Sequence, residues 1–214
     1  MKQRCNEICA LRLLYTCSPI ELEGKAQIGR FRYGLGRLLG QKVDKELSKQ
    51  LDYIVPIPNS GLYYAMGAAE SMGVPYLQAL VKRDVQKRTL REPNQQIREQ
   101  MILDNMMLLP GLLEGKNIAL VDEAIFTGTT LKTVCRRLRE QGVGKIHIMI
   151  PTSLCSTPCP YDDMPQQDLL ARKLSSVEMQ EYFGVTSLTF LSYTDLHDYT
   201  ETFQHVCLNC FQQS

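Results

Sequence analysis

The stretch of residues 118–132 constrains the fold of this chain more than any other. Four apolar residues, Ile118 to Val121, run directly into the acidic pair Asp122 and Glu123. A short apolar run that ends in a turn is typical of a strand buried on both faces, as in a parallel sheet. We therefore expect two carboxylates at the carboxyl end of a central strand.

A hydroxyl-rich turn, Thr127 to Thr130, follows the acids, and apolar residues then recur at helical spacing over residues 131–141. The turn thus begins a helix, whose free N–H groups form an anion site. This order suits a ligand with both a sugar diol and a phosphate, because carboxylates accept hydrogen bonds from hydroxyls while N–H and hydroxyl groups bind phosphate. For the acids alone, a solvated acidic pair at a strand end is the alternative.

Composition narrows the class of protein. The 214 residues suffice for one domain, or for one domain with an appendage. Lys and Arg nearly balance Asp and Glu, and the net charge of +1 argues against nucleic-acid binding, which requires many neutralised phosphates. Residues 1–7 are polar and no long apolar segment follows, so we expect no signal peptide, no membrane segment and a cytoplasmic location.

Strand and helix patterns alternate along the chain and predict an α/β core with a mainly parallel sheet. The expected strands, the first of them a strand or an extended entry segment, are residues 10–16, 51–58, 74–82, 118–121, 145–150 and 187–191. The expected helices are residues 22–49, 62–72, 94–107, 131–141, 166–174, 176–183 and 193–199. Five glycines weaken the prediction of the first helix.

Two further stretches bear on phosphate chemistry. Pro58 to Gly61 forms a second strand–turn–helix junction where a pyrophosphate can meet backbone donors. For this stretch alone, an ordinary turn and cap is the favoured explanation. Residues 83–109 form a long connection with several basic side chains. Such a connection inside a domain is typical of a functional lid, and a solvated helix is the alternative.

Eight cysteines in a chain without export signals suggest a cause other than disulfides. Cys135 lies on an apolar helical stripe, which favours a place in the core, whereas Cys207 and Cys210 have the spacing of metal ligands. The tail that carries this pair has little apolar content, so a metal centre would tie it to the rest of the chain. Incidental thiols and a four-cysteine zinc site remain alternatives.

Longer motifs add a family resemblance. They occur in the family's order and spacing at residues 53–61, 64–67, 73–76, 88–89, 98–100, 114–116, 121–130, 175–178 and 187–192. Over nearly its whole length the chain resembles the phosphoribosyltransferase domain of glutamine 5-phosphoribosyl 1-pyrophosphate (PRPP) amidotransferases. The resemblance implies a type I phosphoribosyltransferase fold in residues 1–200, with a mainly parallel sheet flanked by helices, and a cysteine-containing C-terminal tail in residues 201–214.

The resemblance also implies a PRPP site. Asp122 and Glu123 would hold the ribose hydroxyls and help to bind Mg²⁺. The remaining residues carried over from the family are Thr127, Gly128, Thr129 and Thr130 for the 5-phosphate, Asn59, Ser60 and Gly61 for the pyrophosphate, and Lys82, Arg88 and Arg98 in a closing loop over residues 82–107. Asp122, Glu123, Arg88 and Arg98 would serve catalysis.

Some positions depart from the family pattern. Glu123 replaces an Asp, Thr127 an Arg and Asn59 an Asp, and the loop has Asp84, Leu103 and Asn105 where the family has basic residues. Fewer positive charges around a pyrophosphate leaving group weaken transition-state stabilisation. The departures therefore bear on turnover more than on PRPP binding.

The implied reaction transfers ribose 5-phosphate from PRPP to ammonia or another amine and releases pyrophosphate. Because Met1 is followed by Lys2 and not by the family's nucleophilic cysteine, we expect ammonia to be free or to come from a separate glutaminase. We also expect a homo-oligomer. The alternative function is a catalytically impaired protein that senses PRPP or a nucleotide.

A subgroup of the family carries a [4Fe–4S] cluster, and the resemblance implies the ligands Cys9, Cys159, Cys207 and Cys210 here. Cys155 competes with Cys159 for one ligand position, and Cys5 competes with Cys9 for another. A structural role is expected for the cluster, because PRPP chemistry involves no electron transfer.

Overall fold

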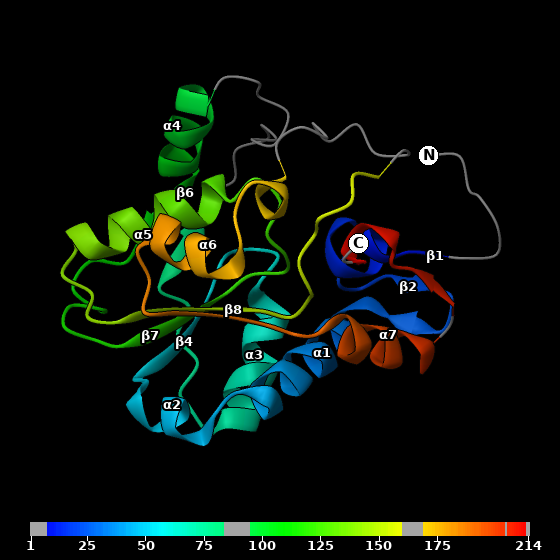
Figure 1. The fold of residues 1–214 in the computed structure, drawn as a ribbon. Helices are drawn as coiled ribbons and strands as arrows, with labels where there is room; N and C mark the ends of the chain where they lie inside the picture. The colour runs from blue at the N-terminus through cyan, green and yellow to red at the C-terminus, as the bar shows by residue number, and fades with distance from the viewer. Residues whose placement is uncertain (1–7, 84–94, 160–168, 204, 213–214) are drawn as a thin grey trace.

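A four-stranded parallel sheet lies at the centre of the computed structural model, which describes residues 8–83, 95–159, 169–203 and 205–212. Its strands are β4 (Tyr53–Pro56), β7 (Ile118–Val121), β8 (Ile146–Ile150) and β9 (Ser187–Phe190), in that spatial order (Figure 1). Every neighbouring pair is parallel. The predicted α/β core with a parallel sheet is confirmed.

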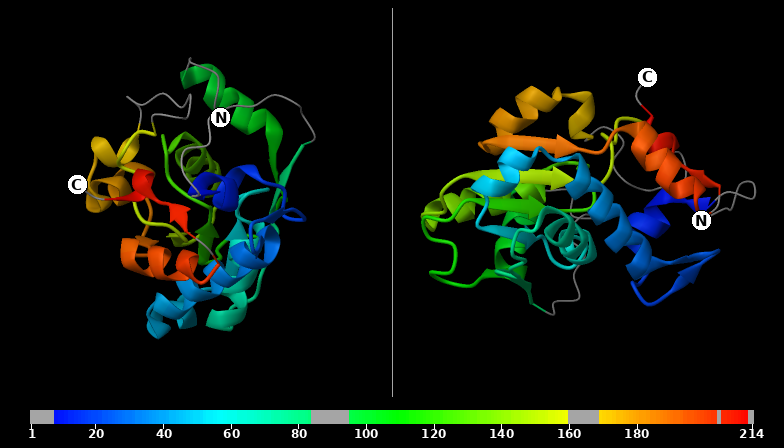
Figure 2. Two further views of the ribbon diagram at one scale, coloured as in Figure 1. Left: turned by 90° about the vertical axis from the view of Figure 1, so that its right-hand side faces the viewer. Right: turned by 90° about the horizontal axis from the view of Figure 1, so that it is seen from below.

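Helices cover both faces of this sheet (Figures 1 and 2). The helices α1 (Ile28–Lys42), α3 (Leu62–Met72) and α7 (Tyr193–Glu201) pack on one face, and α5 (Thr129–Glu140) and α6 (Ser176–Phe183) pack on the other. Successive residues of β8 alternate accordingly, since Ile148 belongs to the α5 side and Met149 to the α1 side. The short helix α2 (Lys45–Gln50) leads from α1 into β4.

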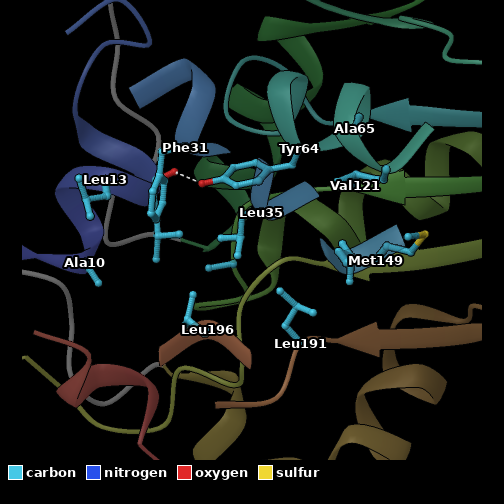
Figure 3. Packing of buried hydrophobic residues seen from close by; sticks show 14 of the residues in the cluster. Ala10, Leu13, Phe31, Leu35, Tyr64, Ala65, Val121, Met149, Leu191 and Leu196 are labelled. Atoms are coloured by element: carbon cyan, nitrogen blue, oxygen red, sulfur yellow. Dashed lines mark hydrogen bonds between the residues drawn. The ribbon is translucent and has the colours of Figure 1, made fainter. Parts of the chain in front are cut away.

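Close approach of α1 and α3 explains several glycines. A Cβ on Gly36 would lie 2.1 Å from the carbonyl oxygen of Tyr64, and one on Gly67 would lie 2.0 Å from that of Tyr33. Figure 3 shows Tyr64 beside Phe31 in the cluster that results. The prediction of one helix over residues 22–49 is partly wrong, because a hairpin of β2 (Leu22–Glu23) and β3 (Ala26–Gln27) precedes α1 and α2 is separate.

The prediction of a strand or extended segment over residues 10–16 is wrong. A two-residue strand, β1 (Ile8–Cys9), is followed by a π-helical turn, η1 (Arg12–Thr16). Two buried side chains from other helices bind its carbonyl groups: Arg32 Nε donates to Leu13 O at 2.8 Å, and the Tyr64 hydroxyl donates to Leu14 O at 2.9 Å. Tertiary contacts thus stabilise a turn that local sequence does not predict.

The predicted strand over residues 74–82 is also partly wrong. Tyr76 forms only an isolated parallel bridge with Ile54, and β5 (Leu80–Lys82) leaves the main sheet to pair antiparallel with β6 (Met106–Leu108). The expected helix over residues 94–107 is present as α4 (Gln95–Asn105). The antiparallel pair of β5 and β6 lies beside α5, as does α4 (Figure 1).

The C-terminal part follows the predicted order. Ser175 caps α6 with a capping box and Gly184 ends it at φ 63°. Of the predicted helix over 166–174, residues 166–168 lie outside the described part, and a 3₁₀ turn, η4 (Leu170–Arg172), follows. β9 and α7 match the predictions for residues 187–191 and 193–199.

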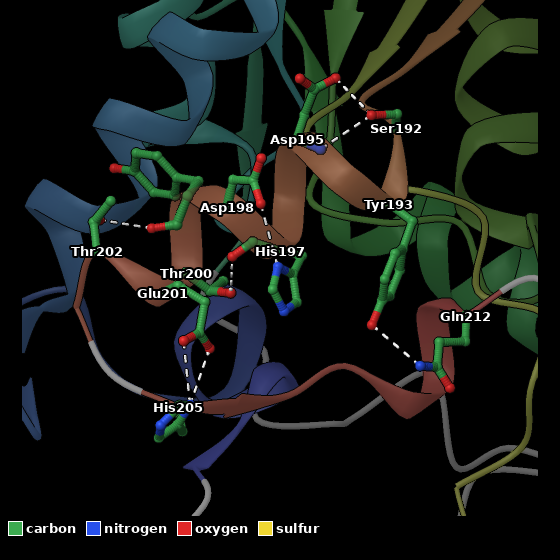
Figure 4. A network of polar contacts seen from close by, with 11 residues as sticks. Ser192, Tyr193, Asp195, His197, Asp198, Thr200, Glu201, Thr202, His205 and Gln212 are labelled. Atoms are coloured by element: carbon green, nitrogen blue, oxygen red, sulfur yellow. Dashed lines mark hydrogen bonds and ion pairs between the residues drawn. The ribbon is translucent and has the colours of Figure 1, made fainter.

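The tail docks against the start of the chain. β10 (Val206–Cys207) pairs in parallel with β1, and the 3₁₀ turn η5 (Asn209–Phe211) follows. Figure 4 shows Gln212 reaching back to α7, where its Nε2 donates to the Tyr193 hydroxyl at 3.2 Å. The expectation of a tail with too little apolar content to dock is wrong, because Phe211 is fully buried. The proposed division at residue 200 stays a prediction.

No helix among the described residues is both long enough and apolar enough to cross a lipid bilayer.

Candidate functional site

The acidic pair lies where the sequence predicted it, at the carboxyl end of β7. All four residues of β7 are fully buried, and Asp122 and Glu123 are only 5% and 6% exposed. Ligands of open parallel sheets bind outside the carboxyl ends of the strands. Two buried carboxyl groups at this edge are therefore the centre of the candidate site.

Asp122 is held by hydrogen bonds to one of its oxygens. The Ser60 hydroxyl donates to Asp122 Oδ1 at 2.9 Å, and the Glu123 backbone N–H donates to the same atom at 3.0 Å. Burial and then the neighbouring Glu123 carboxylate raise the pKa of Asp122 well above its usual value. A cation or a set of hydroxyl donors at this site would offset that cost.

Glu123 carries the oxygen of the pair that has no hydrogen-bond partner among the described residues. This oxygen is Oε2, and it is buried. The Glu123 backbone carbonyl accepts a hydrogen bond from the Thr152 hydroxyl at 3.2 Å. A buried acceptor without a partner is costly unless a ligand satisfies it, and a sugar hydroxyl or a divalent cation has the matching chemistry.

The turn of residues 58–61 lies directly beside the acids because Gly61 lacks a side chain. A Cβ on Gly61 would lie 2.2 Å from the carbonyl oxygen of Val121, the last residue of β7. Ile57 N–H donates to that same carbonyl at 2.8 Å. The peptide between Pro58 and Asn59 is cis, Asn59 is exposed, and Gly61 begins α3.

The turn of residues 127–130 begins α5 as predicted. Gly128 is the N-cap residue with φ 73°, a left-handed conformation that favours glycine. The hydroxyls of Thr127 and Thr129 lie 3.1 Å apart, and Thr129 is buried. The structure thus brings both predicted turns, each at the amino end of a helix, to the edge of the sheet that carries the acids.

The structure describes the predicted basic residues of the loop only in part. Lys82 is exposed at the end of β5, Arg88 lies outside the described residues, and only the backbone of Arg98 is described, on α4. Of the departures, Asp84 is not described, whereas Asn105 is buried and its carbonyl accepts from Arg83 N–H at 2.7 Å. The roles of these basic residues stay predictions.

The four predicted cluster ligands come from three segments that meet at the tail. Cys9 and Cys207 are register partners in the β1–β10 pair. Burial raises the pKa of Cys9, and the neighbouring Cys159 and Cys207 raise it further. We call the meeting point of Cys9, Cys159, Cys207 and Cys210 the cysteine junction.

Cys210 completes the junction. Burial raises its pKa, and Cys159 adds to the rise through its charge and through a hydrogen bond between the two thiols. Cys155, the rival of Cys159, is buried and also lies near Cys210, whereas Cys5 is outside the described residues. Among the described residues, no three His, Cys, Asp or Glu side chains are placed to hold a single metal ion.

Two functional contacts escaped sequence reasoning. Thr152 holds the Glu123 backbone from the end of β8, and the signal for it was a Thr–Ser pair at the carboxyl end of a predicted strand. Arg32 is 3% exposed and binds the turn that follows Cys9. The available signal was that Arg32, alone of the three arginines in residues 28–39, falls at the helical spacing of the apolar positions.

A wide groove lies elsewhere on the molecule. It encloses about 920 Å³ and lies between residues 153–157, the start of α7 and the tail. Neither acid lines it. The buried, under-satisfied carboxyl pair is a better indicator of chemistry than the size of a cavity, so we place the site at the acids.

Comparison with known proteins shows the family of the chain. The phosphoribosyl transferase domain family matches residues 26–161. The amidophosphoribosyltransferase of Synechococcus elongatus is 32% identical over 208 residues, which are 96% of this chain and 41% of that relative. The Bacillus subtilis amidophosphoribosyltransferase is 30% identical over 213 residues, which are 96% of this chain and 44% of that relative.

Solved structures agree. The glutamine PRPP amidotransferase from B. subtilis, complexed with ADP and GMP, superimposes with a TM-score of 0.80 at 29% identity, over 96% of this chain and 46% of that one. A structure described as the allosteric regulatory enzyme of purine biosynthesis gives the same TM-score and identity over 96% and 45%. The chain thus spans less than half the length of the relatives that it matches.

Proposed function

Because the chain belongs to the phosphoribosyl transferase domain family and has the type I phosphoribosyltransferase fold, we propose that it binds Mg-PRPP at the acidic pair. There it would transfer the 5-phosphoribosyl group to ammonia or another amine and release pyrophosphate. The relatives named above are amidophosphoribosyltransferases. We propose an amine acceptor on the basis of that name.

One observation carries the proposal: a buried carboxyl pair with a free acceptor oxygen lies between two turns that begin helices. Glu123 Oε2 lacks a partner, and Asp122 is fixed by Ser60 from the neighbouring turn. The two carboxyl groups suit the vicinal hydroxyls of a ribose. The amino ends of α3 and α5 suit the phosphates on either side of it.

The chemistry needs no protein nucleophile. The bond between C1 of the ribose and the pyrophosphate oxygen breaks with its electron pair leaving on oxygen, and the amine lone pair forms the new bond to C1. The nitrogen then loses one proton, which an oxygen of the departing pyrophosphate can accept. The protein holds the two reactants in line and excludes water. Asp122 and Glu123 would fix the ribose and stabilise the positive charge that develops at C1, and Mg²⁺ would offset the charge of the leaving pyrophosphate.

Residues 127–130 would bind the 5-phosphate. The donors are the Thr127 and Thr129 hydroxyls and the N–H groups at the start of α5. Asn59, Ser60 and Gly61 would bind the pyrophosphate at the start of α3. Lys82, Arg88 and Arg98 would close over it from the loop.

Pyrophosphate release tests this function. The purified full chain would be incubated with Mg-PRPP and either ammonium or glutamine. Release with ammonium but not with glutamine is expected. Release with glutamine alone would contradict the proposed ammonia dependence, while tight Mg-PRPP binding without any release would favour a PRPP sensor over an enzyme.

We also propose that the cysteine junction holds a [4Fe–4S] cluster. The donor set fits: four thiols from three distant segments converge, and Cys9 and Cys207 lie opposite each other on paired strands. In such a cluster each cysteine binds a different iron, so the sulfurs lie farther apart than the four ligands of one zinc ion. The cluster would tie the tail to the N-terminal segment.

Metal analysis distinguishes the options. Anaerobically purified protein should contain about four irons per chain, and Cys207→Ser should lose them. A colourless protein with one zinc per chain would contradict the cluster. Cys155→Ser and Cys159→Ser, compared side by side, would show which of the two thiols is the ligand, and we expect iron loss only with Cys159→Ser.

A further inference from the structure

The segment of residues 151–157 runs from the end of β8 to the tail and carries four hydroxyl side chains. It passes between the helices α5 and α6 and the N- and C-terminal segments, as the yellow stretch of Figure 1 shows. Thr152 and Ser153 at its start are 0% and 4% exposed. Buried hydroxyls are costly without partners, so the partners of these two define what the segment does.

Thr152 forms a hydrogen bond with the acidic pair. Its hydroxyl donates to the Glu123 backbone carbonyl at 3.2 Å, with both groups buried. Asp122 is held separately, by hydrogen bonds from the Ser60 hydroxyl and from the Glu123 N–H. The Glu123 carboxyl has a free Oε2 and a hydrogen bond with the Asp122 carboxyl. Thr152 holds the peptide from which the Glu123 side chain extends.

Ser153, Ser156 and Thr157 form hydrogen bonds with the tail. The Ser153 hydroxyl donates to Phe211 O at 3.1 Å, and the N–H groups of Ser156 and Thr157 donate to Cys210 O at 3.1 and 3.2 Å. The hydroxyls of Ser156 and Thr157 donate to Gln212 O at 3.0 and 3.3 Å. Three consecutive tail carbonyls are thus bound by one short segment.

Adjacent residues therefore hold two different parts of the molecule. Thr152 and Ser153 share one peptide group, so a displacement of the tail that pulls on Ser153 also changes the angle at which Thr152 meets Glu123. Because both hydroxyls are buried, neither can exchange its partner for water without opening the structure. The segment is a contiguous physical connection between the acids and the cysteine junction.

We propose that Thr152 is a positioning residue for Glu123 and that residues 151–157 couple the PRPP site to the tail. The inference rests on the proposed function, because PRPP is the ligand whose binding reports the position of Glu123. Coupling between two sites is reciprocal. An ordered tail favours PRPP binding, and bound PRPP orders the tail by the same factor.

Two measurements on the full chain test the coupling. Calorimetry would give the Kd of Mg-PRPP for the parent, Thr152→Val, and Thr152→Ser, which keeps the hydroxyl. Thr152→Val should raise the Kd about tenfold, as expected for losing one buried hydrogen bond, and Thr152→Ser should restore it. Hydrogen exchange of peptides covering residues 206–212 would be compared with and without Mg-PRPP.

Mg-PRPP should slow exchange of the tail in the parent and in Thr152→Ser, but not in Thr152→Val. A merely structural role for Thr152 would leave the response of the tail to Mg-PRPP intact. Ser153→Ala breaks the connection on the tail side. It should speed tail exchange without ligand and remove the response as well, which keeps the test decisive should Thr152→Val fail to fold.

The outcomes separate the two proposals. If the parent binds Mg-PRPP but the tail does not respond, or if Thr152→Val binds like the parent, the coupling is wrong and the proposed function stands. If the parent does not bind Mg-PRPP at all, the proposed function is wrong and the coupling falls with it.

Discussion

The acidic site and the cysteine junction are built in different ways. The acids and both turns belong to two strand–turn–helix units, and within each unit the functional residues follow a strand by a few positions. The junction collects Cys9, Cys159, Cys207 and Cys210 from segments about 150 and 50 residues apart along the chain. Its regular elements are short: the two-residue strand pair of β1 and β10 and the 3₁₀ turn η5, which contains Cys210.

This difference indicates what each region depends on. The acids are fixed by a fully buried sheet, so their arrangement should persist without ligand. The junction joins segments far apart along the chain through a two-residue strand pair, and three of its four thiols are only partly buried. The acidic site should therefore be rigid and the junction should gain most from a bound metal centre.

The largest effect is expected from removing both charges of the acidic pair. Asp122→Asn with Glu123→Gln should weaken Mg-PRPP binding on the order of 100-fold or more, because each carboxylate loses charge-assisted hydrogen bonds worth roughly 1.5–3 kcal/mol. Calorimetry measures the Kd. Glu140→Gln, an exposed acid at the end of α5, is the matched control. Iron content should not change, since the junction is a separate region. An unchanged Kd for Mg-PRPP would contradict the assignment of the acids to the PRPP site.

A mutation in the cysteine junction should remove the iron and affect Mg-PRPP binding less. Cys207→Ser should lose the iron completely, because a [4Fe–4S] cluster requires all of its thiolate ligands, while Mg-PRPP binding falls by a smaller factor through the tail. Iron analysis and calorimetry on the same preparation give both numbers. Cys17→Ser, a buried thiol outside the junction, is the control that should keep its iron. Equal losses of iron in both variants would contradict the ligand assignment.

A third mutation should affect both regions together. Gly36→Ala places a Cβ 2.1 Å from a backbone carbonyl of α3, which carries the turn beside the acids, and α1 also supports the N-terminal turn through Arg32. Overpacking of this kind costs about 3 kcal/mol, so thermal unfolding should begin several degrees lower. Gly73→Ala, at φ 66° with open space around it, should cost only about 1 kcal/mol. Similar melting temperatures for the two variants would show that α1 and α3 can separate.

The smallest effect concerns the ion pair between Lys42 on α1 and Asp195 on α7, 2.7 Å apart. The hydrogen bond from Lys42, and then that from Ser192, lowers the pKa of Asp195. A lowered folded-state pKa stabilises the fold above the unfolded pKa, and this contribution is lost as pH falls through the folded value. Lys42→Met should therefore cost about 0.5 kcal/mol at neutral pH, since the pair is partly exposed, and less in acid.

Chemical unfolding at several pH values measures that difference. Lys49→Met removes a pair of similar geometry within the exposed helix α2, where both partners are about 70% and 68% exposed, and should cost less. A pH-independent cost for Lys42→Met would show that the pair contributes through packing and not through charge.

Sequence patterns predicted the core elements well where local signals were strong. The strands β4, β7, β8 and β9 and the helices α3, α5 and α6 follow from apolar runs and from caps such as Ser175 and Gly184. The misses share one cause. The turn η1 and the antiparallel pair of β5 and β6 take their form from partners far along the chain, such as Arg32 for η1. No local pattern encodes those partners.

By itself, the sequence determined the acidic pair and both turns, because each is a short motif whose position relative to a strand is set by chain connectivity. The four cysteine ligands were predicted from the family resemblance. Only the tertiary structure decided which groups hold the acids. The bonds from Ser60 to Asp122 and from Thr152 to Glu123 join residues 62 and 29 positions apart. Such contacts arise when parallel strands place their carboxyl ends side by side, and that arrangement follows from packing the whole sheet between its helices.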